Sequence, residues 1–186
     1  MRTNLGNKHI VFLPQPVLII ATYDENGKPN AMNAAWGGQT DFDMISIALS
    51  KHKTTDNILL NKAFTISFAT KKLEVISDYF GVVSAEKEDK IKKSGLTIEK
   101  SEFVNAPIIL EYPLTLECEF VSYENEVLVG RVLNVNVDND YINENGKIDV
   151  SKLELITYDS INGVYRELGG VVGVAFKDGL KFKSEK

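Results

Sequence analysis

Residues 50–58, SKHKTTDNI, gather side chains that suit a negatively charged ligand. Three basic-type side chains follow one another, and two threonine hydroxyls come next. A helix pattern then begins over residues 54–62, with a threonine cap, an acid in the first turn and a lysine at its end. The free N–H groups and partial positive charge of a helix start attract anions. The pattern is typical either of a phosphate site or of an ordinary capped helix with solvated lysines. The ligand candidates are Ser50, Lys51, His52, Lys53, Thr54 and Thr55.

A second segment, NAMNAAWGGQTDFD at 30–43, holds the only tryptophan of the chain among alanines and glycines. A lone tryptophan usually fills a core, which is the simplest interpretation of Trp36. Small neighbours, however, let a backbone approach a planar ligand closely, and the Asn33 amide can meet ring heteroatoms. A flat heterocycle here, with its phosphate at residues 50–55, would account for both segments. The candidates are Asn33, Ala34, Ala35 and Trp36.

Composition limits the class of protein that can carry these segments. The length of 186 residues predicts one domain, 1–186, and 44% hydrophobic residues permit a sizeable core. A net charge of −5 argues against binding of nucleic acid and, more weakly, against a broad anionic membrane surface. One cysteine excludes an intrachain disulfide, and two histidines argue against a histidine-rich metal site. His9 has no evident partner. With no signal-like start and no apolar run of about 20 residues, we expect a soluble, cytoplasmic protein.

Strand patterns dominate the chain and must position the two segments. Apolar or alternating runs predict strands at 17–23, 44–50, 63–69, 113–124 and 127–138, and less firmly at 147–150 and 163–168. Asn26-Gly27 predicts a hairpin turn after the first strand, since both residues tolerate positive φ. In the alternating run Cys118 points inward with leucines, which indicates a core thiol.

Helices are fewer. Besides 54–62, the sequence predicts a short helix at 73–81, ended by Gly81, and another at 84–95, begun by Ser84 and ended by Gly95. Many short strands with a few inserted helices favour a mainly β protein that closes an antiparallel barrel. Strands and helices do not alternate regularly, which argues against a doubly wound parallel sheet.

At this point a family resemblance emerges. The stretch FLPQPVLIIATYDENGKPNAMNAAWGG resembles the opening of the flavin reductase-like, FMN-binding split-barrel family, and of its flavoredoxin branch in particular. HKTTDNI, AFTISFA, DYFG, DKIKKSGLT and APIILEYPLTLEC match later landmarks in the same order. The resemblance extends to about residue 175.

The resemblance implies a six-stranded antiparallel split β-barrel of Greek-key type, usually a homodimer with FMN near the subunit interface. It implies that residues 31–36 line the isoalloxazine and that residues 50–55 hold the phosphate. It further implies that Lys90 reaches the cofactor and that Tyr165 covers the flavin, although the residues alone suggest a solvated lysine and a barrel aromatic. Some relatives have an arginine where this chain has Lys51-His52-Lys53, so the main phosphate contact stays open.

The implied activity is transfer of hydride from NAD(P)H to bound FMN, and of electrons onward to a free flavin or a protein acceptor. Such chemistry belongs to the cofactor, so no catalytic side chain and no metal are expected. The chain has no G-x-G-x-x-G motif after a strand, so no Rossmann site for the nicotinamide is expected. Three alternatives stay open: a non-enzymatic flavin-binding electron carrier, a relative of pyridoxamine-phosphate oxidase, and a β-barrel interaction domain without cofactor.

Overall fold

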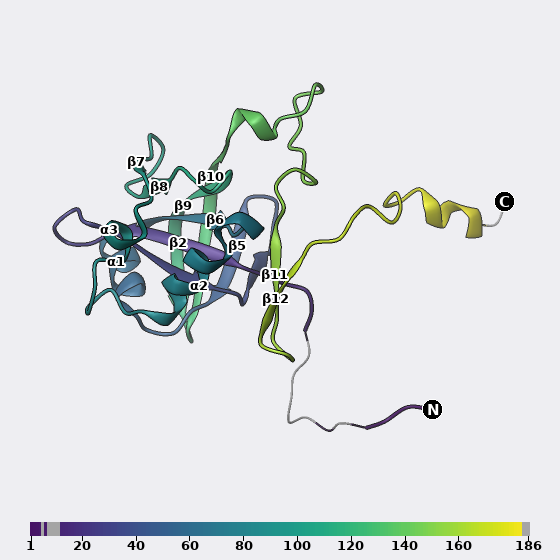
Figure 1. Cartoon of the computed structure of the whole chain (residues 1–186), viewed down its shortest axis with the longest axis horizontal. Coiled ribbons are helices and arrows are strands. Elements are labelled where there is room, and N and C mark those ends of the chain that lie inside the picture. The colour runs from purple at the N-terminus through teal and green to yellow at the C-terminus, as the bar shows by residue number, and fades with distance from the viewer. Residues whose placement is uncertain (5, 7–11, 184–186) are drawn as a thin grey trace.

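The main sheet of the molecule is antiparallel and curled (Figure 1). The computed structural model describes residues 1–4, 6 and 12–183, so His9 lies outside the described residues. Seven strands pair in the order β3-β2-β6-β9-β10-β5-β4. These strands are β2 (Leu18–Tyr23), β3 (Pro29–Ala34), β4 (Gly37–Gln39), β5 (Met44–Ala48), β6 (Ala63–Phe68), β9 (Leu114–Glu124) and β10 (Val127–Val137).

The two edge strands of this sheet are pieces of one bent segment. β3 pairs with β2 and β4 pairs with β5, and only Ala35 and Trp36 separate β3 from β4. Counting β3 and β4 together gives six strands whose order returns on itself. β2, β3/β4 and β5 follow by hairpins, and β6 then returns beside β2, which is the Greek-key order. The mainly β, six-stranded split-barrel prediction is therefore confirmed, and the seventh strand results from the bend.

Both faces of the sheet are buried, which explains the continuous apolar sequence of β2. Leu18 and Ile20 join a cluster inside the curl, whereas Ile19 and Ala21 join a second cluster under the helices. Cys118 lies fully buried in the inner cluster, and burial raises the pKa of its thiol to about 12. The predicted core thiol is confirmed.

Three helices cover the sheet beside β3 and β2: α1 (Lys53–Asn61), α2 (Glu74–Val82) and α3 (Lys90–Ser94). The prediction that Gly81 ends a helix is wrong, because α2 continues through it to Val82. The helix predicted at 84–95 is also shorter. It begins only after Asp89, whose carboxylate accepts the Lys92 N–H at 3.0 Å, and Gly95 ends it with a φ of 71° as predicted.

Two small sheets flank the barrel. β1 (Gln15–Pro16), β11 (Ile156–Asp159) and β12 (Val164–Glu167) form one, and β7 (Ile98–Lys100) and β8 (Pro107–Ile109) form the other. The predicted strand at 147–150 is wrong, since this segment contributes only an isolated bridge between Ile148 and Ile142.

The remaining elements are short 3-10 turns: η1 (Lys71–Leu73), η2 (Asn139–Tyr141) and η3 (Asp178–Phe182). Beyond β12 the chain runs away from the body to η3 (Figure 1). Within the described part of the chain, the helices are too short or too polar to cross a bilayer.

Candidate functional site

A continuous cleft runs along β3, between the bend and the start of α1. One half, here called the flat pocket, has a volume of about 530 Å³ and is bordered by the β3–β4 bend, α2 and β12. The other half, the cationic pocket, has a volume of about 460 Å³ and is bordered by the start of α1 and by residues 80–90. The two halves share the lining residues Met32, Asn33, His52, Gly81 and Val82. One elongated ligand can therefore occupy both.

The bend supplies the wall of the flat pocket. Ala34, Ala35 and Trp36 line it, and the Trp36 carbonyl accepts a hydrogen bond of 2.8 Å from the Ala48 N–H of β5. Two-thirds of the Trp36 side chain is exposed (66%), so the interpretation of this tryptophan as a core filler is wrong. The strand pairing fixes the backbone and leaves the indole free at the pocket.

The opposite wall is α2, and Gly81 explains how closely it approaches. The Asn33 side-chain amide donates to the Ser77 carbonyl at 2.9 Å, which ties β3 to α2. A Cβ at position 81 would lie 3.3 Å from the Asn33 Cβ, tighter than most such contacts. The glycine in this helix therefore serves close packing beside the pocket. The Asn33 oxygen stays available to a ligand.

A tyrosine–carboxylate pair closes the end of the flat pocket. The Tyr165 hydroxyl of β12 donates to the Asp78 carboxylate of α2 at 2.7 Å, and the Tyr165 ring packs 6.0 Å from that of Tyr158. Burial and the adjacent Asp78 carboxylate raise the pKa of Tyr165 well above its usual range. The phenol thus stays protonated and holds the β11–β12 hairpin against α2.

Threonine hydroxyls shape the start of α1. The Thr55 hydroxyl accepts the His52 N–H at 3.3 Å and donates to the Ser50 carbonyl at 2.9 Å, while the Thr54 hydroxyl accepts from the Asn30 amide at 2.9 Å. These bonds fix the loop before the helix, whose first N–H groups lack intrahelical acceptors. Thr55 is fully buried and lies outside the lining of both pockets, so its side chain positions the loop.

Three lysines border the cationic pocket, each in a different state. Lys51 is exposed, and Lys53 forms an ion pair of 2.7 Å with Glu25 on the β2–β3 turn. That bond raises the pKa of Lys53. Lys90 is only 4% exposed, and its ammonium donates to the Phe80 carbonyl at 3.1 Å. The expectation of a solvated lysine at position 90 is therefore wrong.

Lys90 is electrostatically unusual. Within the described residues, no carboxylate forms a salt bridge with it, and burial lowers the pKa of its ammonium to about 8. A buried ammonium without a counter-ion is costly. Its position at an anion-sized opening gives the cationic pocket a positive group that a bound anion would satisfy.

The fold brings the predicted site residues together around one cleft, with Thr55 directly behind it. Sequence reasoning missed Asp78, Gly81, Val82 and Tyr158, which also line the flat pocket. Asp78 and Gly81 belong to the DYFG segment, which carried a family landmark but no assigned role. Their spacing on α2 was the available signal, because residues three apart on a helix share a face.

The chain matches the model of the family described as "Flavin reductase like domain" over residues 10–159. It therefore belongs to that family.

Individual relatives agree in fold. The flavoredoxin of Desulfovibrio vulgaris (Miyazaki F) is 30% identical and superimposes with a TM-score of 0.92, over 96% of this chain and 100% of that one. A flavoredoxin from Methanosarcina acetivorans is 26% identical, with a TM-score of 0.87 over 98% and 99% of the two chains. A protein from Archaeoglobus fulgidus, whose function is uncharacterised, is 27% identical over 81% of this chain and 87% of its own length.

Proposed function

We propose that this protein is an FMN-binding oxidoreductase that accepts hydride from NAD(P)H and passes electrons to a free flavin or a protein acceptor. Membership of the flavin reductase like family supports a flavin-linked redox function. The likeness to two flavoredoxins supports the same class. As the family resemblance implies, we also propose that the protein is a homodimer.

The observation that carries this proposal is the joined cleft. One half is flat and lined by small side chains and aromatics, and the other half is cationic. FMN has the same two parts, a tricyclic ring and a phosphate. We assign the ring to Asn33, Ala34, Ala35, Trp36 and Tyr165.

The phosphate suits the start of α1. We assign it to the segment from Ser50 to Thr55 and to Lys90. The buried Lys90 ammonium, without a carboxylate partner among the described salt bridges, matches a dianionic ligand. Since Lys53 is paired with Glu25, we propose that Lys51 and Lys90, with the first N–H groups of α1, make the main phosphate contacts.

When bound, FMN supplies the hydride acceptor at its N5 and the route for electrons onward. The chain itself binds and orients. The bond between Tyr165 and Asp78 fixes one end of the flat pocket, and the Ala34–Ala35 backbone gives a close, flat surface. The exposed Trp36 leaves the cleft open for a nicotinamide to stack from solvent. No proton transfer by a side chain is needed.

An electron carrier without NAD(P)H activity is the second candidate, favoured by the likeness to flavoredoxins. Anaerobic spectroscopy separates the two functions. The protein is loaded with FMN, and its absorbance near 450 nm, roughly that of oxidised flavins generally, is followed after NADH or NADPH is added. Rapid bleaching supports the reductase. Bound flavin that neither donor bleaches would mean a carrier, and a protein that binds no flavin would refute both.

The phosphate assignment has its own test. The double variant Lys51→Ala/Lys53→Ala should bind FMN about 10–100-fold more weakly, because charge-assisted contacts contribute roughly 1.5–3 kcal/mol each. Riboflavin, which lacks the phosphate, is the matched ligand and should bind both proteins alike. Lys72→Ala, an exposed change outside both pockets, is the control variant. Equal losses for FMN and riboflavin would contradict the assignment.

A further inference from the structure

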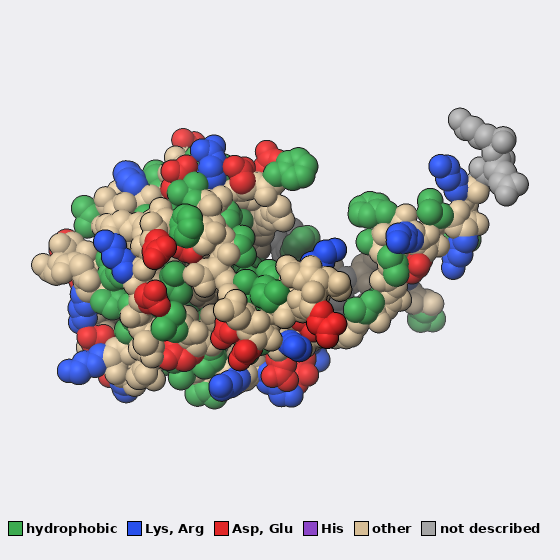
Figure 2. Space-filling model, turned by 90° about the horizontal axis from the view of Figure 1, so that it is seen from above, with side chains coloured by type: hydrophobic (Ala, Val, Ile, Leu, Met, Phe, Trp, Pro, Cys, Tyr) green, Lys and Arg blue, Asp and Glu red, His purple; other side chains and the backbone are tan. Residues whose placement is uncertain are grey.

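The segment after β12, residues 169–183 and here called the C-terminal arm, carries apolar side chains that its own chain leaves uncovered. Val172 and Phe176 are 103% and 98% exposed, as in an isolated extended peptide. Figure 2 shows the arm projecting from the body with hydrophobic side chains and lysines along it. A monomer rarely leaves an apolar surface of this kind open.

The arm is nevertheless locally structured. The Val174 N–H donates to the Asp178 carboxylate at 2.8 Å, and the Asp178 N–H bonds back to the Val174 carbonyl at 3.2 Å. A Cβ at Gly173 would lie 2.6 Å from the Asp178 carboxylate, so the glycine permits this turn. The turn holds the apolar run VVGVAF (171–176) outward, and that composition is unlike a solvated linker.

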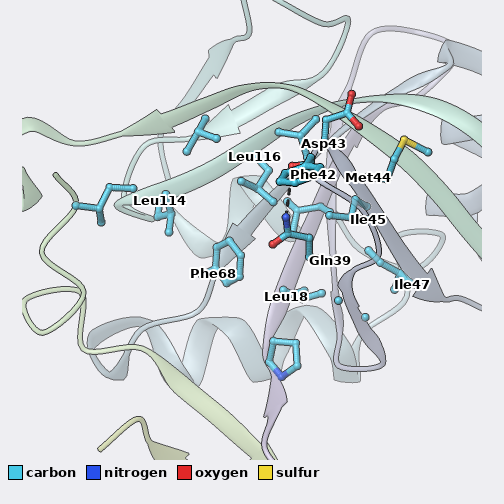
Figure 3. A pocket seen from close by; sticks show the side chains of 17 residues that line it. Leu18, Gln39, Phe42, Asp43, Met44, Ile45, Ile47, Phe68, Leu114 and Leu116 are labelled. Atoms are coloured by element: carbon cyan, nitrogen blue, oxygen red, sulfur yellow. Dashed lines mark hydrogen bonds between the residues drawn. The ribbon is translucent and has the colours of Figure 1, made fainter. Parts of the chain in front are cut away.

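The barrel has an apolar opening of about 490 Å³ that the described residues leave unfilled, here called the barrel cavity. Leu18, Phe68, Leu114 and Leu116 point into it, as Figure 3 shows. Phe42 stands at its rim with a fully exposed ring. The barrel cavity shares no lining residue with the two pockets of the cleft, so the proposed cofactor does not account for it.

Charge favours a second copy of this chain as the partner of the arm. Three lysines against one aspartate give the arm +2, so the remainder of a chain of net charge −5 carries −7. Asp43 stands at the rim of the barrel cavity beside Phe42. A basic apolar arm thus complements an acidic body with an apolar opening. The arm leads away from its own body, toward a neighbour (Figure 1).

We propose that the C-terminal arm of one copy packs over the barrel cavity of a second copy, and that the reciprocal exchange forms a two-fold dimer. Two-fold symmetry satisfies both arms and both cavities. Two phenylalanines per arm bury about 300–500 Å² when covered, and exchange doubles this. The valines and cavity walls bring the total toward the ~1,200–2,000 Å² of a specific interface. The inference rests on the proposed homodimer, not on the flavin.

Cross-linking between differently tagged full-length chains tests the exchange. Chains with Phe42→Cys are mixed with chains carrying Phe176→Cys and treated with a flexible bismaleimide. Both positions are exposed, and the native Cys118 is fully buried, so background reaction is low. The mixture should give a cross-linked heterodimer well above that of a control pair, Phe42→Cys with Val75→Cys. Equal yields would overturn the exchange, as would a double variant that links only within one chain.

Sedimentation measures the energetic part. The variant Val172→Ser/Phe176→Ser should raise the dimer dissociation constant at least tenfold, whereas Val75→Ser/Phe103→Ser, matched in residue type and also exposed, should not. A monomeric wild-type protein overturns the exchange, and so does an unchanged constant in the arm variant. FMN binding is recorded for each protein. A monomer that binds FMN refutes only the arm exchange, and a dimer that does not bind FMN refutes only the proposed function.

Discussion

At the scale of single residues, Lys90 is the clearest sign that the fold is arranged for a ligand. The neighbouring lysines of the cleft region have carboxylate partners: Lys28 with Asp89, and Lys53 with Glu25. Lys90 instead faces a carbonyl in a nearly closed position. Its burial costs stability in the free protein, and we expect that cost to be offset when an anion binds.

The substitution Lys90→Met should therefore stabilise the free protein while weakening FMN binding. Burial lowers the pKa of Lys90 from 10.5 to about 8. The unfolded state thus binds more protons between these values, and the penalty is fully present below pH 8 and disappears as the pH rises through 10.5. We expect the free energy of unfolding to rise by ~1–2 kcal/mol at pH 7, net of the lost hydrogen bond, and less at pH 10.

Urea unfolding of both proteins at pH 7 and pH 10 measures this difference. Lys93→Met on the same helix is the control, because Lys93 is exposed and paired with Glu88, and its gain should be absent at both pH values. A Lys90→Met protein that is less stable than wild type at pH 7 would show that the ammonium is needed structurally.

Much of the candidate site was predictable at this scale, because ligand-binding residue types stood in two short segments. Three-dimensional packing decided the rest. Whether Trp36 fills a core or faces a pocket depends on a bend that no periodicity reveals. Likewise Thr55 and Thr54 are alike in sequence, yet only Thr54 lines the cationic pocket. The Asp78–Tyr165 pair joins residues 87 positions apart.

At the scale of elements, strands and hairpins were predictable because local chemistry determines them. Asn26-Gly27 forms its turn, with Gly27 at a φ of 75°, and β9 and β10 follow the alternating runs. Helix limits were less predictable. Ser84 is a good cap by type, but the chain between it and Asp89 forms turns, and the cap that the structure uses is Asp89. Propensity cannot choose between two caps that differ in tertiary surroundings.

Close packing between strands gives a prediction at Gly130 of β10. A Cβ there would lie 2.4 Å from the Phe64 ring, which is fully buried in the inner cluster. Gly130→Ala should therefore lower the free energy of unfolding by ~1–3 kcal/mol through overpacking. Gly38→Ala is the matched control, since nothing lies within 4 Å of its Cβ position. Thermal unfolding compares the two, and equal melting temperatures would refute the packing argument.

At the scale of the whole molecule, charge is distributed unevenly along the chain, and the arm carries the basic surplus. If the exchange holds, association has an electrostatic part that salt screens. The two surfaces proposed for FMN and for a second copy lie on different residues, so each can be altered alone.

Reversing the arm lysines tests this electrostatic part. The variant Lys177→Glu/Lys181→Glu/Lys183→Glu should weaken dimerisation, and more so at low than at high ionic strength, because it places like charges together. The control is Lys72→Glu/Lys100→Glu/Lys152→Glu, which makes the same change of net charge at exposed positions on the body. Sedimentation at two salt concentrations gives both constants. Equal weakening by both variants would assign the effect to net charge alone.

The bend at Ala35–Trp36 has one practical consequence. Gly37 and Gly38 line the barrel cavity while Trp36 lines the flat pocket, so the sole indole of the chain stands where the two meet. Its emission spectrum is therefore a built-in optical probe, free of signal from other tryptophans. Quenching as flavin is added and a wavelength shift as the protein is concentrated would report the two events separately, without any label.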